Sequence, residues 1–409
     1  LTVRPCLGAQ ASHQGKRLKT LVLAFALLTA AAPSPEISTP VHPVAEVRGN
    51  RERQAQALLI RLRKQHELPA LAAVVVRADT TLDLAVTGVR QQGKPETVEL
   101  ADRFHLGSMG KAITATVIAR LIEEGKLSWA TRPVDVFPEL ATSVHAGYRE
   151  ATIEQLLRHE AGAPPYDSIA EIKGASAHAG SGSPADLRRA FSVWLLQQRP
   201  AVAPKKRPEY SNAGYPVAAA MAEAATGEAW ESLVESRLAR PLGIDLVYGL
   251  PARGDSPQPW GHKPKSALLG MATYQNAVEP QAPGDGWALS VVFVPAGDYS
   301  LSLADYAKFL QLHLAGLAGR DGLLKSSSIR HLHAGAGEYA MGWFLREFDG
   351  TAAHWFTGST ETFFSRVIML PERDIAVAVL TNAGNEAAST ASREAAMELL
   401  RIHGQPATR

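Results

Sequence analysis

The sequence predicts an α+β fold, in which an antiparallel sheet built from the N- and C-terminal segments is flanked by helices and a helical lobe is inserted at roughly residues 130–300. Apolar, β-prone runs occur at residues 71–77 and 82–89, and again between residues 339 and 380. Helical periodicity dominates between them, from residue 152 to about residue 242. Strand-forming segments at both ends, with helices between them, favour one sheet closed by the two ends of the chain.

The first 32 residues are predicted to be an export signal. The basic residues 16–19 precede an apolar run at residues 21–28, and the small residues 29–32 follow that run. This order is typical of a secretory signal cleaved near Ala31, and an uncleaved interfacial anchor is the alternative. We therefore expect an exported protein, periplasmic or secreted.

Composition limits the classes of partner. The proline-containing residues 33–50 are predicted to link the signal to a domain at residues 51–405. Acids and bases are interspersed and sum to a net charge of +2, which does not favour nucleic-acid binding. No second apolar run is long enough to span a membrane. The single cysteine, Cys6, lies within the predicted signal, so no disulfide is expected in the mature chain.

The N-terminal half should begin with a helix, a hairpin and a second helix. The first helix is expected at residues 51–66, and the hairpin turns at residues 78–81. The second helix follows Ser108 and is ended by Gly125. Further helices follow, interrupted by the Gly/Ser/Ala-rich residues 174–183, which we expect to form a surface loop.

The C-terminal part should supply most of the sheet. A helix at residues 302–314, capped by Ser302, precedes it, and a helix at residues 386–402 closes the chain. Residues 371–374 have the composition of a turn between the last two strands. The predicted strands lie at residues 339–348, 354–357, 363–370 and 375–380.

Ser108 and Lys111 form the only Ser-x-x-Lys pair in the sequence, and they open an apolar helix. A serine becomes a good nucleophile when a neighbour accepts its proton, and a desolvated lysine one helical turn away can do so. The helix N-terminus adds free N–H groups and a positive dipole end. The alternative is that Ser108 only caps the helix and Lys111 is solvated.

Several other catalytic motifs are absent from the sequence. There is no Gly-x-Ser-x-Gly, no Gly-x-Gly-x-x-Gly and no Walker loop. His66 and His159 are each followed by glutamate, but neither has the second histidine of a zinc-protease motif. His331 and His333 have strand-like spacing without nearby metal ligands, so we interpret them as ordinary surface or core residues. We predict no cofactor and no metal site.

Two Tyr-x-Asn triplets are candidate partners for the Ser-x-x-Lys pair. Tyr210 and Asn212 follow a proline-containing turn and precede a helix beginning near Gly214, whereas the triplet at residues 274–276 has no framing element. We prefer Tyr210, whose phenol beside ammonium-type charges would have a lowered pKa and act as a general base. Asn212 would either hold a substrate amide or orient Lys111. The alternative for Tyr210 is a buried tyrosine whose hydroxyl bonds a backbone group.

A glycine-containing segment near the C-terminus completes the candidate site. Thr357, Gly358 and Ser359 follow a short strand-like run. Gly358 would let a substrate chain approach the strand edge closely. The backbone N–H of Ser359 would then join that of Ser108 as an oxyanion hole.

These motifs together resemble the serine β-lactamase and penicillin-binding-protein superfamily, and most closely its class C β-lactamase, esterase and D-peptidase branch. The resemblance covers roughly residues 65–402 and includes five segments that fit the family's pattern, at residues 104–139, 152–159, 210–215, 241–243 and 302–309. It implies a β-lactamase/transpeptidase-like fold with the active site between the sheet and the helical lobe. It also implies Ser108 as the acylated nucleophile, Lys111 as its proton partner and Tyr210 as the general base, with Asn212 positioning the substrate.

The third motif departs from this pattern. The family has Lys or His, then a small residue, then Gly, whereas this chain has Phe356, Thr357 and Gly358. Thr362 also stands where a glycine is expected before an aromatic residue. Phe356 lacks the side chain that helps such enzymes hold a substrate carboxylate. His354 lies on the same strand face but roughly 7 Å away, so it is no simple substitute.

We therefore expect an exported serine hydrolase that acts through a Ser108 acyl-enzyme. Its substrate would be a small ester, a lactam or a cell-wall peptide bound along residues 356–359, and esterase or D-peptidase activity is favoured over efficient β-lactamase activity. The alternative is a catalytically impaired member of the superfamily that binds a cell-wall peptide or another ligand.

Overall fold

The computed structural model describes residues 50–203, 208–253, 257–265, 277–283, 290–335 and 337–404. The predicted signal, nearly all of the predicted linker and the second Tyr-x-Asn triplet lie outside these described residues. Across the described ranges, no helix combines the length and the apolar character that crossing a membrane requires.

The main sheet has six strands in the order β2-β1-β11-β10-β9-β8, and every neighbouring pair is antiparallel. Its two N-terminal strands pair with a C-terminal strand, which confirms the predicted closure of one sheet by both ends of the chain. The predicted run at residues 339–348 forms a strand only in its second half. The strands are β1 (Ala70–Arg77), β2 (Thr80–Gly88), β8 (Phe344–Phe348), β9 (Thr351–Ser359), β10 (Phe364–Leu370) and β11 (Ile375–Thr381).

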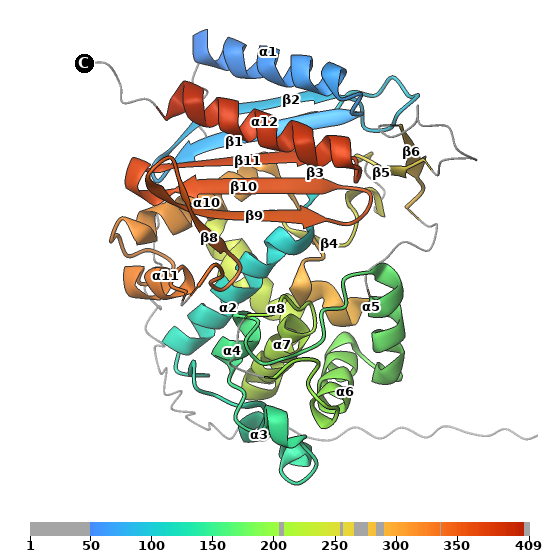
Figure 1. Cartoon of the computed structure of the whole chain (residues 1–409), viewed down its shortest axis with the longest axis vertical. Helices are drawn as coiled ribbons and strands as arrows, with labels where there is room; N and C mark the ends of the chain where they lie inside the picture. The colour runs from blue at the N-terminus through green and yellow to red at the C-terminus, as the bar shows by residue number, and fades with distance from the viewer. Residues whose placement is uncertain are drawn as a thin grey trace, which may run out of the picture. The chain divides into compact units, whose positions relative to one another are not determined.

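Helices cover both faces of this sheet (Figure 1). The helices α1 (Asn50–Gln65) and α12 (Glu386–His403) lie on one face, where residues such as Leu59 and Leu399 pack against Val75 and Val377. On the other face, α10 (Leu303–Leu317) and α2 (Gly110–Glu123) pack against the alternate strand residues. Because both faces are covered, β11 is buried along its whole length and is a continuous apolar run.

The inserted helices form a layer beside α2 (Figure 1). Its centre is α7, whose small and apolar residues are nearly all buried. The fully buried guanidinium of Arg188 on α6 bonds Glu223 of α7 at 2.6 Å and Glu231 of α8 at 2.9 Å, which ties three helices together. The helices are α3 (Pro133–Val136), α4 (Ile153–Leu157), α5 (Ile169–Ser176), α6 (Pro184–Gln197), α7 (Gly214–Thr226), α8 (Trp230–Val234) and α9 (Arg240–Leu242).

The predicted loop at residues 174–183 is wrong over its first half, because α5 and a 3₁₀ turn, η4 (Ala177–Ala179), occupy it. Ser168 caps α5 in a reciprocal capping box with Glu171, and Ile172 and Ala175 are buried. One glycine in a helix costs only about 1 kcal/mol, which capping and burial offset.

Smaller elements join the sheet to the helical layer. A three-stranded sheet has the order β3 (Arg103–His105), β7 (Tyr299–Ser302) and β4 (Val247–Tyr248). The strands β5 (Gly261–Pro264) and β6 (Val278–Gln281) pair with each other, and α11 (Ser326–Leu332) follows α10. β3 pairs with β7, and the start of the Ser108 turn contacts Gly297 and Asp298, which precede β7.

Candidate active site

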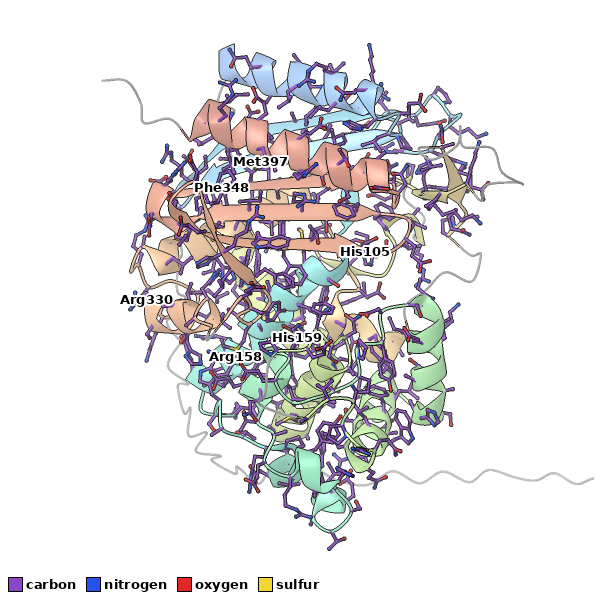
Figure 2. All side chains as sticks on the ribbon, in the orientation of Figure 1. His105, Arg158, His159, Arg330, Phe348 and Met397 are labelled. Atoms are coloured by element: carbon purple, nitrogen blue, oxygen red, sulfur yellow. The ribbon has the colours of Figure 1, made fainter. Side chains whose placement is uncertain are left out.

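Ser108 lies in a 3₁₀ turn, η1 (Gly107–Met109), that leads directly into α2. No side-chain cap bond is present at either start, so Ser108 is not the helix cap of the alternative interpretation. His105, labelled in Figure 2, fixes the turn from the side: its Nδ1 accepts a 2.9 Å bond from the Gly107 N–H, and its Nε2 donates to Asp298 at 2.8 Å. Because both ring nitrogens of His105 form hydrogen bonds, the turn is held in one conformation.

Glycines allow three backbone segments to meet at Ser108. A Cβ on Gly358 would lie 1.9 Å from the Leu106 carbonyl oxygen, and one on Gly297 would lie 2.2 Å from that of Gly107. Gly107 itself has a φ of +53°. In the structure, Gly358 permits the close approach of the protein's own turn, and the expected approach of a substrate chain stays a prediction.

Lys111 is fully buried and points back to the nucleophile. Its Nζ lies 3.2 Å from Ser108 Oγ, 2.6 Å from Asn212 Oδ1 and 2.8 Å from the Ala296 carbonyl oxygen. Burial holds the pKa of Lys111 well below its usual value, and the carboxylate of Asp167 opposes that effect. Lys111 is therefore desolvated, as the sequence predicts, and not solvated.

Asn212 and Tyr210 reach the pair from the segment before α7. Asn212 Nδ2 donates to the Tyr166 carbonyl oxygen at 2.9 Å, which turns Oδ1 towards Lys111. Two roles were predicted for Asn212. The structure shows the contact that orientation of Lys111 needs, a bond from Lys111 to Asn212, and the other role, binding of a substrate amide, stays a prediction. The Tyr210 hydroxyl donates to Ser108 Oγ at 2.8 Å, so its partner is the candidate nucleophile and not a backbone group.

The predicted lowering of the Tyr210 pKa is wrong, because burial raises this pKa above its usual value, against the effect of the bond to Ser108. Lys111 Nζ lies over the Tyr210 ring, 4.9 Å from its centre. His159, labelled in Figure 2, packs on the same ring at 4.6 Å, and burial holds its pKa well below the usual value. Neutral aromatic side chains therefore pack around the Tyr210 ring.

The third motif forms the opposite wall, along β9. The Phe356 ring is buried and stacks on Phe344 at 5.2 Å, and it lies 6.4 Å from the Tyr210 ring. It thus extends the aromatic surroundings of Tyr210 at the position where a cation was expected. His354 bonds His333 instead of turning to the cleft.

The two expected oxyanion donors lie on adjacent backbones. A Cβ on Gly107 would lie 2.7 Å from the Ser359 nitrogen, and a Cβ on Gly358 would lie 2.9 Å from the Ser108 nitrogen. The two backbone segments that carry the amides of Ser108 and Ser359 are therefore in close contact.

A cavity of about 390 Å³ opens over these residues. Ser108, Tyr210 and Asn212 line one side of it, and Phe356, Thr357 and Ser359 line the other. The structure also adds lining residues that the sequence analysis missed: Asp167, Ile169, Ile172, Phe293, Phe344 and Glu361. No motif marks these residues, since they come from loops, helices and a strand that only the fold brings together.

The family of the chain follows from comparison with known proteins. Residues 55–401 match the family model described as Beta-lactamase. The chain belongs to the Beta-lactamase family. The resemblance inferred from the sequence is thus confirmed, and so is the α+β fold.

The chain is also similar to several known proteins. The chain is 27% identical to "Penicillin-binding protein 4" of Amycolatopsis lactamdurans over 345 residues, covering 79% of this chain and 83% of the relative. It is 26% identical to "Unguisins hydrolase ungD'" of Aspergillus campestris over 299 residues, covering 68% of this chain but only 52% of the relative. A solved structure with the same fold is the D-alanine carboxypeptidase AmpC of Burkholderia cenocepacia, with a TM-score of 0.66, 20% identity and coverage of 86% and 98%.

Proposed function

We propose that this protein is a serine hydrolase that forms an acyl-enzyme at Ser108 with an ester or a peptide-like amide. The observation that carries the proposal is the position of Ser108 Oγ, within hydrogen-bond distance of both Lys111 Nζ and Tyr210 Oη at the wall of an open cavity. A nucleophile, a proton acceptor and a proton donor are what acyl transfer requires. Membership of the Beta-lactamase family supports a hydrolase.

The lowered pKa of Lys111 and the raised pKa of Tyr210 indicate which of them accepts and which donates a proton. Lys111, with its lowered pKa, is the group that accepts the Ser108 proton as Oγ attacks the carbonyl carbon. Tyr210, with its raised pKa, keeps its proton and can give it to the leaving group. The amides of Ser108 and Ser359 would stabilise the oxyanion. Water would then hydrolyse the acyl-enzyme with the roles reversed.

Esterase or peptidase activity is proposed over efficient β-lactamase activity. Support comes from Phe356, an apolar side chain at the position where a cation would help to hold a substrate carboxylate. Further support comes from the names of two similar proteins: D-alanine carboxypeptidase names a peptidase, and Unguisins hydrolase names a hydrolase. Neither name assigns a substrate to this chain.

The test combines three substrates with one variant. Purified protein is incubated with a p-nitrophenyl ester, nitrocefin and a D-Ala-D-Ala peptide, and acylation is followed by intact-protein mass spectrometry with a fluorescent penicillin. Ester turnover and a covalent adduct are expected in the parent protein and in Ser143→Ala, an exposed serine control. Both should be lost in Ser108→Ala. Absence of any Ser108-dependent acylation would contradict the proposal.

A catalytically impaired binding protein is the second candidate, and Phe356 is the observation that favours it. Turnover that is abolished by Ser108→Ala would exclude this candidate. Ligand-dependent thermal stabilisation that survives Ser108→Ala, without turnover in the parent protein, would favour it.

Export is also proposed, with support from residues 1–32 alone. Expression of the full chain in a bacterial host should yield a mature N-terminus near residue 32. An intact N-terminus on membrane-associated protein would favour the uncleaved anchor instead.

A further inference from the structure

Two carboxylates and no basic side chain line the cavity beside Ser108, among the lining residues that the structure describes. Asp167 enters from the helical layer, before α5, and Glu361 enters from the sheet, directly after β9. Both side chains are exposed. The substrate entrance is therefore bordered by negative charge on opposite walls.

The backbone holds Asp167 in place on both sides. The preceding carbonyl oxygen, that of Tyr166, accepts the 2.9 Å bond from Asn212. The following residue, Ser168, caps α5. Asp167 is thus fixed relative to Asn212, and its charge acts on both Lys111 and Tyr210.

Glu361 is also fixed. Its N–H donates to Ser359 Oγ at 3.2 Å, and a Cβ on Gly384 would lie 2.0 Å from the Glu361 carbonyl oxygen, so the two backbones are in close contact. The backbone of Glu361 has a φ of +63°, which is unusual for a residue other than glycine. Glu361 lines the same cavity as Ser359, so its carboxylate borders the space that a substrate bound along Ser359 would occupy.

Isoleucine and phenylalanine side chains form the apolar part of the cavity lining. Ile169 and Ile172 line it from α5, and the rings of Phe293, Phe344 and Phe356 line it from other elements. A matching substrate has an apolar or aromatic body and a positive charge that reaches the entrance. A substrate carboxylate would meet like charge there, with no basic partner among the described lining residues.

We propose that Asp167 and Glu361 are specificity-determining residues, which make the site prefer esters or amides that carry a free amine over those that carry a carboxylate. This inference rests on the proposed acyl transfer at Ser108. It adds that the preferred substrate carries a positive charge.

The test uses three p-nitrophenyl phenylacetates that differ only in the para group: aminomethyl, hydroxymethyl or carboxyl. Because the leaving group is the same, ratios of kcat/KM report the charge preference and cancel any general effect on the chemistry. At low salt we expect kcat/KM to fall from amine to alcohol to acid, by about tenfold or more over the series. At roughly 1 M salt the series should converge.

The variants identify the source of the preference. In Asp167→Asn combined with Glu361→Gln, the amine-to-acid ratio should fall to within about threefold of one, whereas Glu372→Gln, an exposed acid in the turn at the far end of β10, should keep the parent ratio. Equal kcat/KM for the three esters, or an unchanged ratio in the double variant, would overturn this inference but not the proposed hydrolase function. Absence of any Ser108-dependent nitrophenol release would overturn both.

Discussion

Lys111 lies closer to Asn212 than to Ser108, since its Nζ is 2.6 Å from Oδ1 and 3.2 Å from Oγ. Oδ1 and the Ala296 carbonyl oxygen are pure acceptors, so together they take two N–H groups from the amine. A neutral amine has two N–H groups and one lone pair, and the lone pair is then left for the Ser108 hydroxyl. The site is therefore suited to a neutral Lys111 that acts as a base.

The first prediction concerns the charge state of Lys111. Asn212→Asp places a carboxylate beside Nζ, which should raise the pKa of Lys111 by about 1–3 units. Because the neutral amine is the active form, the acidic limb of the kcat/KM profile should move to higher pH, and activity at pH 7 should fall by about tenfold or more. Asn212→Ala is the uncharged control. An acidic limb in the same place in both variants would contradict this role for Lys111.

The second prediction separates the two possible roles of Tyr210. If the phenol gives its proton to the leaving group, Tyr210→Phe should slow an alkyl ester or an amide by about 100-fold or more. It should slow a p-nitrophenyl ester far less, because p-nitrophenolate leaves without a proton. If Tyr210 instead removes the Ser108 proton, as the sequence analysis expected, both substrates should slow equally. The ratio of the two losses is the measurement.

The third prediction concerns Phe356. Phe356→His places a group that can be protonated beside Thr357 in the cavity wall, so nitrocefin should gain in kcat/KM relative to a neutral ester. Phe356→Leu, which keeps the side chain apolar, is the control. If the relative rate of nitrocefin does not change in Phe356→His, the substrate carboxylate does not approach residue 356.

The fourth prediction concerns the backbone contact at Gly358. The added methyl group of Gly358→Ala meets the Leu106 carbonyl oxygen at 1.9 Å, so the turn must move. Loss of stability by about 1–3 kcal/mol in chemical denaturation and loss of acylation are expected. Gly174→Ala is the control, because no atom lies within 4 Å of its Cβ position in α5 and the helix should gain up to about 1 kcal/mol. Parent-like acylation by Gly358→Ala would contradict a tight contact.

Local signals account for what could be predicted from the sequence. The helix that follows Ser302 and the pair of Tyr210 with Asn212 are marked by residues close to each other in the chain. Asp167 and Glu361 are not, since their meeting at one cavity depends on how the helical layer lies against β9. The predicted lowering of the Tyr210 pKa was wrong for the same reason. The sequence does not show that aromatic rings bury the phenol, and this burial raises its pKa.

A chain of three histidines beside the sheet provides the last prediction. The Thr116 hydroxyl donates to the Ala112 carbonyl oxygen, so it accepts from His313 Nε2 at 3.1 Å. His313 Nδ1 then accepts from His333 Nε2 at 2.8 Å, and His333 Nδ1 bonds His354 Nδ1 on β9. His331 lies in α11 and His333 is the residue that follows it, so the strand conformation that their spacing suggested is wrong. His313 and His333 must stay neutral for this order to persist, because each accepts a hydrogen bond at Nδ1.

Acid should therefore destabilise the fold through these histidines. Burial lowers the pKa of His354 to about 4 and that of His313 to about 3, against a usual value of 6.5. The unfolded chain binds these protons first, so the stabilisation is complete above pH 6.5 and is lost as pH falls from 6.5 towards 4. For His354 alone the loss is roughly 3 kcal/mol. Urea denaturation from pH 7.5 to 4.5 should show a shallower pH dependence in His354→Phe and a parent-like one in His178→Gln, an exposed histidine. Equal slopes in the parent protein and in His354→Phe would exclude His354 as a source of acid sensitivity.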